Sequence, residues 1–282
     1  MAKDTFLNGK TTVNLKGKLL DLAVPAVMAI LNITPDSFYA GSRSNTVDDA
    51  LRRAEGFLND GAKFIDIGAY SSRPGAAELS PDEELQRLLP VIEAITKKLP
   101  EAILSIDTFR ARVAKETILA GAHMINDISA GSMDEAMFET VAELQVPYVI
   151  MHMKGTPQTM QQHTQYQDIG MEVVSYFAAK VTALKKLGVK DIIIDPGFGF
   201  AKTLEQNYEL FRQMDNLQVI GLPMLVGISR KSMIYKLLDT TPEAALNGTT
   251  VLNTLALQKG AAILRVHDVR EAVECIKILT LA

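Results

Sequence analysis

Short apolar runs that alternate with longer helical stretches restrict the fold of this chain more than any other feature. Eight such runs follow one another, at residues 27–32, 64–68, 103–107, 124–129, 148–153, 192–197, 224–229 and 263–268. This alternation is typical of repeated βα units, in which parallel strands are buried on both faces. Eight units close into a barrel, and 282 residues is an ordinary length for one such barrel. We therefore expect an α/β fold, a (β/α)8 TIM barrel, with residues 1–282 forming a single domain.

The residues before the first run predict a separate small element. Residues 5–21 alternate short polar and apolar stretches around the pair Asn8-Gly9, which is a strong signal for a hairpin turn. We expect residues 1–23 to form an N-terminal β-hairpin appendage that closes the bottom of the barrel.

Charge and cysteine usage exclude several classes of partner. The formal net charge is −4, from 29 basic and 33 acidic residues, which gives no sign of a nucleic-acid-binding surface. No apolar run approaches the roughly 20 residues of a membrane span, and the first residues contain no signal-peptide core. Cys275 is the single cysteine, so we expect neither disulfides nor a cysteine metal cluster. These observations predict a protein that stays in the cytoplasm.

Nearly every apolar run ends in a polar or charged residue. In a parallel barrel the catalytic groups lie at these strand ends, where the βα loops open to solvent. The competing interpretation is that each residue caps the following helix, as Asn and Asp often do. Because the pattern recurs at all eight runs, a shared pocket is favoured. The residues are Asn32, Asp66, Asp107, Asn126, Asp127, His152, Asp195, Ser229, Arg265 and His267.

Basic residues near the last two runs predict an anion site. Arg265 and His267 lie two positions apart, so both should point to the same side of the last strand and form an oxyanion clamp. Ser229, Arg230 and Lys231 precede a helix, whose free N–H groups would add to the binding of an anion or an electron-rich ring. A surface ion pair remains the alternative role for Arg230.

Other residues at these strand ends give weaker signals. Asp195 is followed by a Pro-Gly turn at residues 196–200, in which glycine lets the backbone approach a ligand closely. The oxygen of Asn32 is a suitable ligand for Mg2+, which takes few protein ligands and fills its shell with phosphate and water. His152 belongs to no HExxH motif, so we expect a structural role for it. The long loops 33–45 and 68–80 are candidate lids over a substrate.

Eight motifs of the chain resemble, in the same order, those of the dihydropteroate synthases: ILNITPDSF, SSRPGA, SIDTFR, INDIS, MHMKG, DPGFGF, ISRKSM and RVHDV. The resemblance runs from about residue 26 to residue 270, and eight ordered motifs make it highly specific. It implies a transferase of folate biosynthesis that condenses 6-hydroxymethyl-7,8-dihydropterin pyrophosphate with 4-aminobenzoate. It also implies Mg2+ as cofactor, inhibition by sulfonamides and a homodimer, for which the apolar stretch ALNGTTVLNTLALQ offers an interface.

The resemblance implies a role for each matching residue. The catalytic residues would be Asp107, Asp195, Lys231, Arg265 and His267. The pterin ring would contact Asp107, Asn126, Met151, Asp195, Gly227, Lys231 and Arg265. The 4-aminobenzoate would be bordered by Ser72, Arg73, Pro74, Phe200 and Ser232. Pyrophosphate would bind Asn32, Ser72, Arg73, Arg265 and His267, and Asn32 would also hold Mg2+.

The chain departs from the family pattern in two loops. Many members have an acidic residue just before a Gly-Gly pair in the first loop, where this chain reads Tyr39-Ala40-Gly41-Ser42. In the second loop, Ala69-Tyr70-Ser71-Ser72 replaces Gly-Glu-Ser-Thr, so Ser72 must supply the hydroxyl that threonine often gives. Neither change touches the residues implied to bind the pterin ring.

Two other functions share parts of this pattern. A non-catalytic pterin-binding paralogue would keep the pterin contacts and have weakened loops. A methyltetrahydrofolate:corrinoid methyltransferase would share the fold and the pterin site but would not need the SSRPG loop. The SSRP and SRK motifs favour the synthase, whereas the missing acid in the first loop mildly favours the paralogue. Pyrophosphate release that depends on 4-aminobenzoate separates the three functions.

Overall fold

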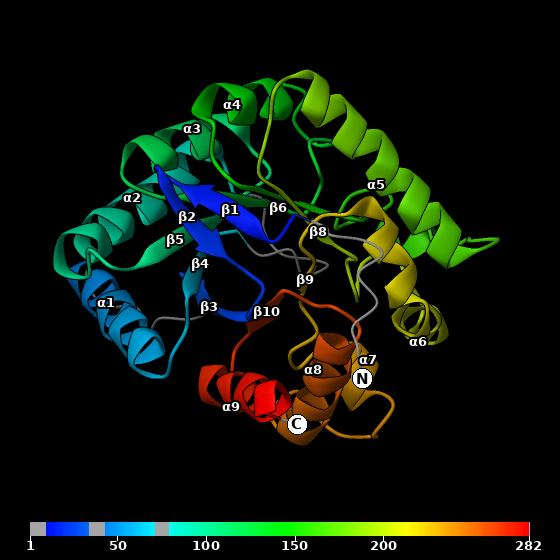
Figure 1. Cartoon of the computed structure of the whole chain (residues 1–282). Coiled ribbons are helices and arrows are strands. Elements are labelled where there is room, and N and C mark those ends of the chain that lie inside the picture. Colours follow the sequence, from blue (N-terminus) through cyan, green and yellow to red (C-terminus); the bar gives the residue numbers. More distant parts are fainter. Residues whose placement is uncertain (1–9, 34–42, 71–78, 282) are drawn as a thin grey trace.

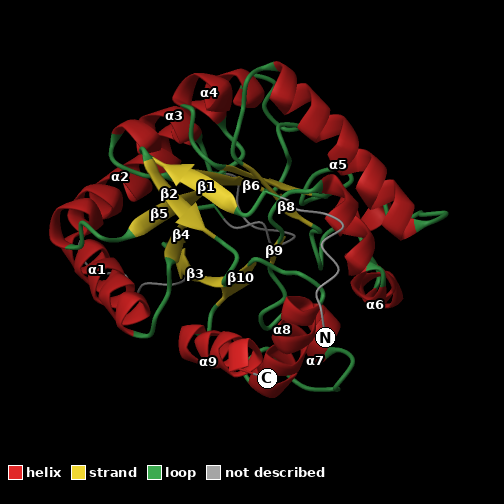
Figure 2. Cartoon of the chain, viewed as in Figure 1, coloured by secondary structure: helices red, strands yellow, loops and turns green. Residues whose placement is uncertain are grey.

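Eight parallel strands form the centre of the molecule, and helices surround them (Figures 1 and 2). The computed structural model describes residues 10–33, 43–70 and 79–281. Each strand overlaps one of the eight apolar runs, because a strand buried on both faces needs apolar residues throughout. The strands are β3 (Ala26–Asn32), β4 (Phe64–Gly68), β5 (Ile103–Asp107), β6 (Met124–Asp127), β7 (Tyr148–Met151), β8 (Ile192–Asp195), β9 (Leu225–Val226) and β10 (Ile263–Val266).

The order of the strands makes the sheet curl into a ring. The hydrogen-bonded order is β8-β7-β6-β5-β4-β3-β10-β9, so the first strand of the series pairs with the last, β10. An isolated parallel bridge between Ile194 and Met224 links β8 to the residue that precedes β9. The two ends of the sheet therefore meet, and the predicted (β/α)8 barrel is confirmed.

Helices follow the strands and cover the outer face of the barrel. Helix α2 begins at a capping box in which the Ser80 hydroxyl accepts from the Glu83 N–H at 3.3 Å. Its apolar face, including Leu88 and Ile92, is buried against the sheet. Within the described ranges, no helix has the length and apolar character needed to cross a bilayer. The α-helices are α1 (Arg43–Asn59), α2 (Pro81–Lys98), α3 (Ala111–Leu119), α4 (Met137–Leu144), α5 (Ile169–Lys186), α6 (Leu204–Arg212), α7 (Ser232–Tyr235), α8 (Leu246–Gln258) and α9 (Val269–Leu281), with 3-10 helices at Met160–Gln162 and Met214–Ile220.

The predicted N-terminal hairpin is present, but its turn lies elsewhere in the sequence. Strand β1 (Thr12–Leu15) pairs antiparallel with β2 (Lys18–Asp21). The two residues between them, Lys16 and Gly17, have φ values of 51° and 89°, and two consecutive positive values are what a type I′ turn requires. The turn of this hairpin is therefore Lys16-Gly17, and the pair Asn8-Gly9, around which the sequence indicated a hairpin, lies outside the described residues.

The hairpin closes the bottom of the barrel. In Figure 1 it lies across the ring of strands, and its buried residues Val13, Leu15 and Leu22 pack against the first inward-facing residues of those strands. The opposite side of the hairpin faces solvent, with Leu19 74% exposed. The barrel therefore has an apolar seal at this end. The strand residues in the seal are Met28, Phe64, Met124, Val149, Ile193, Leu225 and Ile263.

Leu15→Ala should lower the free energy of unfolding by about 2–5 kcal/mol, because it removes buried methyl groups and leaves a cavity beneath the barrel. Leu19→Ala, in the same hairpin, should change it by less than about 0.5 kcal/mol, since Leu19 is exposed. Urea denaturation followed by circular dichroism measures both variants. Equal losses for the two variants would contradict the seal.

Candidate active site

The register of the sheet determines which side chains line the barrel interior. Residues paired in register on neighbouring parallel strands point to the same face, and successive residues of a strand alternate between faces. Above the apolar seal, the register places Asp66 between Ile30 and Ser105, and it places Met151 beside Asp195. We call this layer the floor of the site. It consists of the next inward-facing residue of each strand, two positions beyond those that pack in or against the seal: Ile30, Asp66, Ser105, Asn126, Met151, Asp195, Gly227 and Arg265.

An ion network around Arg265 occupies the centre of the floor and extends to the strand end above it. The Arg265 Nε donates to Asp66 Oδ2 at 2.6 Å, and its Nη2 donates to Asp107 Oδ2 at 2.8 Å. The Asn126 Nδ2 donates to the same Asp66 oxygen at 2.9 Å. One guanidinium thus pairs with two carboxylates, and buried charges require such partners. The predicted residues Asp107, Asn126 and Arg265 lie together. Asp66 was expected in the shared pocket, but the family resemblance gave it no role, although a lone carboxylate within an apolar strand is a signal for one.

Lys231 approaches the floor from the start of α7. Its Nζ donates to the Phe198 carbonyl oxygen at 2.6 Å and lies 4.7 Å from the centre of the Phe200 ring. Both Lys231 and Asp195 border Gly227, since a Cβ atom at that position would lie 3.9 Å from the Lys231 Nζ and from the Asp195 Oδ2, at van der Waals distance. The carboxylate and the ammonium therefore lie beside each other at Gly227, where the motifs placed them.

Burial and neighbouring charges shift the ionisation of these groups. Burial raises the pKa of Asp107 to about 7, against the opposing effect of the Arg265 cation. Burial also raises the pKa of Asp195, which Lys231 counteracts. The pKa of Lys231 is lowered by burial to about 8. The pKa values of Asp107 and Lys231 therefore both lie within about a unit of neutral pH, which is common for groups at functional sites.

The rim of the barrel holds His267, while Arg230 turns away from it. The His267 Nδ1 lies 3.2 Å from the Ser229 hydroxyl oxygen, and the residue is exposed. Partial desolvation and the positive charge of Arg265 lower the pKa of His267 to about 4, so its ring is neutral at pH 7. The Arg230 Nε and Nη2 each donate to Asp268 at 2.8 Å. Arg230 therefore forms an ion pair with Asp268. This confirms the alternative role, an ion pair, that the sequence analysis gave beside anion binding.

The remaining predicted positions are at the rim or outside the described residues. Asn32 ends β3 and Ser232 begins α7, and each is half-buried. Ser72, Arg73 and Pro74 lie outside the described residues, as do residues 39–42 of the first loop. The roles of these loops in binding and closure stay predictions.

Two of the polar strand-end residues point away from the interior. Asp127 accepts a hydrogen bond from the Tyr148 hydroxyl at 2.6 Å. The His152 ring packs edge-on against Tyr176 of α5, with centroids 4.9 Å apart, and its Nδ1 lies 3.0 Å from the Lys202 Nζ. The shared pocket therefore does not include these two residues, because alternation along a strand turns every second side chain outward. This packing agrees with the structural role expected for His152.

Lys202 was missed in the sequence and holds the loop between β8 and α6. Its Nζ donates to the carbonyl oxygens of Gly197 and Phe200 at 2.9 and 3.0 Å, and burial lowers the pKa of Lys202 to about 7. Gly197 has a φ of 69°, and a Cβ atom there would lie 2.1 Å from the His152 carbonyl oxygen. This turn therefore lies close against the end of β7, and its close approach to a ligand stays a prediction. A lysine soon after the DPGFGF motif was the only sequence signal for this role.

Apolar side chains form a wall beside the floor. Several of them come from the loops that follow the strands, and aromatic and methionine side chains together offer a face for a flat ring. Polar groups on the floor and an apolar wall are the usual combination in a small-molecule site. The wall consists of Phe109, Ile128, Met151, Met153, Met160 and Ala201, with Tyr70, Met133 and Phe200 packed against them.

Comparison with known proteins assigns the chain to a family. The model of the pterin-binding enzymes matches residues 28–267. The chain is 44% identical to the dihydropteroate synthase of Escherichia coli (strain K12), over 94% of each chain. It superimposes on the Yersinia pestis dihydropteroate synthase with a sulfonamide drug complex with a TM-score of 0.89, 41% identity, and coverage of 96% of this chain and 98% of that one. For the Xanthomonas albilineans dihydropteroate synthase with 4-aminobenzoic acid, the TM-score is 0.89, the identity 36%, and the coverage 96% and 97%. The chain therefore belongs to the pterin-binding enzyme family, and within it to the dihydropteroate synthases.

Proposed function

We propose that the barrel mouth joins 6-hydroxymethyl-7,8-dihydropterin pyrophosphate to 4-aminobenzoate, giving 7,8-dihydropteroate and pyrophosphate. One observation carries this proposal: carboxylates, an amide and two cations gather at one end of a barrel whose other end is sealed. The dihydropteroate synthase relatives support the same reaction. We place the reaction in the cytoplasm, which the single cysteine of the chain supports.

We assign the pterin ring to the floor. The amino-pyrimidine edge of a pterin carries N–H donors, which the carboxylates of Asp107 and Asp195 and the amide oxygen of Asn126 can accept. Lys231 can donate to the acceptors of the ring. This arrangement satisfies the polar edge of the ring deep in the barrel. The other contacts that we assign to the ring are Met151, Gly227 and Arg265.

We place 4-aminobenzoate above the pterin, next to Phe200 and Ser232. The Phe200 ring offers an apolar face, and the Ser232 hydroxyl can donate to the carboxylate of the substrate. Ser72, Arg73 and Pro74 would complete this site, and Ser72 and Arg73 would also, with Arg265, meet the pyrophosphate.

The demanding step of this reaction is the departure of pyrophosphate. An arylamine is neutral at pH 7, so it attacks through its nitrogen lone pair and needs no strong base. Arg265 and His267 would stabilise the negative charge of the leaving pyrophosphate. Asp107 and Asp195 would stabilise the positive charge that develops on the pterin methylene as the C–O bond loosens. The amine releases one proton to solvent as the new C–N bond forms.

We propose that Mg2+ accompanies the pyrophosphate and is held by Asn32. A single half-buried amide at the end of β3 leaves most of the coordination shell to phosphate oxygens and water, which suits Mg2+. Among the described residues, no group of three or more His, Cys, Asp or Glu could form a cage made of protein ligands alone. When bound, Mg2+ would neutralise part of the charge on the leaving group.

The purified protein should release pyrophosphate from the pterin substrate only when 4-aminobenzoate is present, because the amine is the nucleophile. A coupled pyrophosphate assay measures this release. EDTA should slow the reaction by about 10-fold or more, and added Mg2+ should restore it. Binding of the pterin pyrophosphate without any turnover would overturn the proposal and would identify a non-catalytic paralogue.

Asp107→Asn and Asp195→Asn should each lower kcat by about 100-fold or more, the usual effect of removing a group that stabilises developing charge. In the unaltered enzyme, kcat/KM should fall as the pH drops below about 7, since protonation of Asp107, whose pKa is about 7, removes its negative charge. Asp195→Asn should keep this pH dependence, and Asp107→Asn should lose it. Near-normal turnover of either variant would contradict its catalytic assignment.

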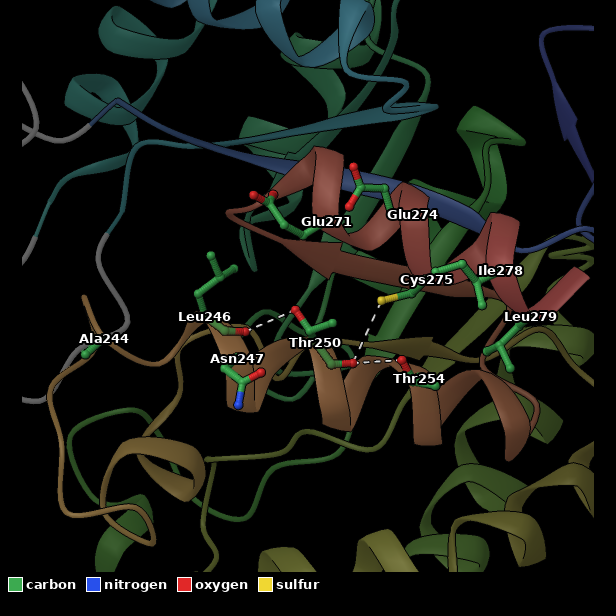
Figure 3. A pocket seen from close by; sticks show the side chains of 10 residues that line it. All are labelled: Ala244, Leu246, Asn247, Thr250, Thr254, Glu271, Glu274, Cys275, Ile278 and Leu279. Atoms are coloured by element: carbon green, nitrogen blue, oxygen red, sulfur yellow. Dashed lines mark hydrogen bonds between the residues drawn. The ribbon is translucent and has the colours of Figure 1, made fainter. Parts of the chain in front are cut away.

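We propose that the enzyme is a homodimer that pairs through α8 and α9. The exposed fractions of Val251, Leu255 and Ile278 on these two helices are 51%, 41% and 67%. Between the helices lies a cavity of about 570 Å³, in which Thr250 and Cys275 face each other (Figure 3). Clustered exposed apolar side chains mark contact surfaces, and a two-fold axis would bring the same patch of both copies together.

Ile278→Lys should convert the dimer into a monomer, because a symmetric contact would bring two copies of the new charge together. Leu119→Lys is the matched control, since Leu119 is 69% exposed on α3, across the barrel from α9 (Figure 1). Size-exclusion chromatography with light scattering measures the mass of each variant. A monomeric unaltered protein, or a dimeric Ile278→Lys variant, would refute this interface.

A further inference from the structure

Asp66 is a buried carboxylate of the floor to which the proposed function gives no task. It lies in the middle of β4 and has no exposed surface. Its Oδ2 accepts from the Arg265 Nε at 2.6 Å and from the Asn126 Nδ2 at 2.9 Å. Within the described part of the chain, its Oδ1 has no hydrogen-bond partner, and neither has the hydroxyl of its register neighbour Ser105. A carboxylate without exposed surface acts on a ligand through the residues that it holds.

Asp66 determines which end of the Asn126 amide is left for a ligand. A carboxylate accepts hydrogen bonds and donates none, so it binds the NH2 end of the amide and disfavours the oxygen. With Nδ2 bound to Asp66, the Asn126 Oδ1 is the atom left free to accept. A ring edge that carries N–H donors is thereby favoured over an edge of acceptors.

The same carboxylate orients the Arg265 side chain. Asp66 binds the Nε and Asp107 binds the Nη2, and two bonds to different strands fix the plane of the guanidinium. Burial alone would lower the pKa of Arg265, but Asp66 and Asp107 together raise it, so the cation persists. Asp66 keeps one of these bonds in place when Asp107 turns to a substrate or takes up a proton.

We propose that Asp66 is a positioning residue that presents the Asn126 oxygen and the Arg265 guanidinium to the substrate without touching it. The inference rests on the proposed function only where it names the pterin as that substrate. It also explains how the site selects its ligand. The Asn126 oxygen can only accept a hydrogen bond, so the ring edge that faces Asn126 must carry a donor.

An exchange of the two residues tests the proposal. Asp66→Asn should weaken the binding of 6-hydroxymethyl-7,8-dihydropterin pyrophosphate by about 10-fold or more, the loss expected for one charge-assisted hydrogen bond. Asn126→Asp should weaken it to a similar degree, because two carboxylates then face each other. In the double variant the amide and the carboxylate have exchanged strands, so the amide on β4 donates to the carboxylate on β6 and accepts from Arg265. Binding should therefore recover to within about 3-fold of the unaltered protein. Calorimetric titration without 4-aminobenzoate measures each Kd.

Asp191→Asn serves as the control for the loss of a buried carboxylate. Asp191 is buried and paired with Lys10 before the start of β8, at the end of the barrel opposite the floor, so this variant should unfold at lower urea concentration and keep its Kd for the pterin. The positioning role would be overturned if the affinity losses of the two single variants added up in the double variant. It would also be overturned if the single variants bound the pterin normally. If Asp66→Asn does not fold alone, the double variant decides: recovered folding and binding support the pairing, and failure of both overturns it. Failure of the proposed function would show separately, as the absence of 4-aminobenzoate-dependent turnover in the unaltered protein.

Discussion

A charged side chain stays inside this barrel only where an opposite charge meets it. Removing an ionised group from water costs several kcal/mol unless a partner compensates. Arg265 meets Asp66 and Asp107, and Lys231 lies beside Asp195. Such pairs need side chains from different segments to reach the same part of the interior, which the inward-facing strand positions and the start of α7 provide. The balance of charge therefore requires the closed sheet, and the chemistry that we propose depends on that balance.

Support from outside the barrel is as important as pairing within it. Lys202 and Gly197 hold the loop after β8 against the end of β7, and this loop carries the carbonyl oxygen of Phe198 and the ring of Phe200, both of which contact Lys231. The position of the Lys231 ammonium thus depends on how this loop is held. Small displacements in such a supporting layer are expected to change binding without any change in the contacting residues.

The barrel and most of the floor could be predicted because both depend on local patterns. An apolar run that ends in a polar residue specifies a buried strand and its loop end. The task of Asp66 could not be predicted, since its partner Arg265 lies 199 residues away and only the closed sheet brings them together. The side to which His152 turns depends on strand alternation, which single polar residues do not reveal. The turn at Lys16-Gly17 was not predicted because the Asn-Gly preference is strong locally, whereas the packing of Val13 beneath the barrel requires strands at residues 12–21.

The apolar seal beneath the floor closes one end of the barrel, so in the described part of the chain a ligand reaches the floor from the opposite end. Under the proposed function, the pterin occupies the deepest position, and 4-aminobenzoate lies between it and solvent. A molecule that settled first in the outer position would obstruct the inner one. The architecture thus imposes an order of arrival, with the pterin pyrophosphate ahead of the arylamine. The joined product leaves by the route through which both substrates entered, so its release must precede the next arrival.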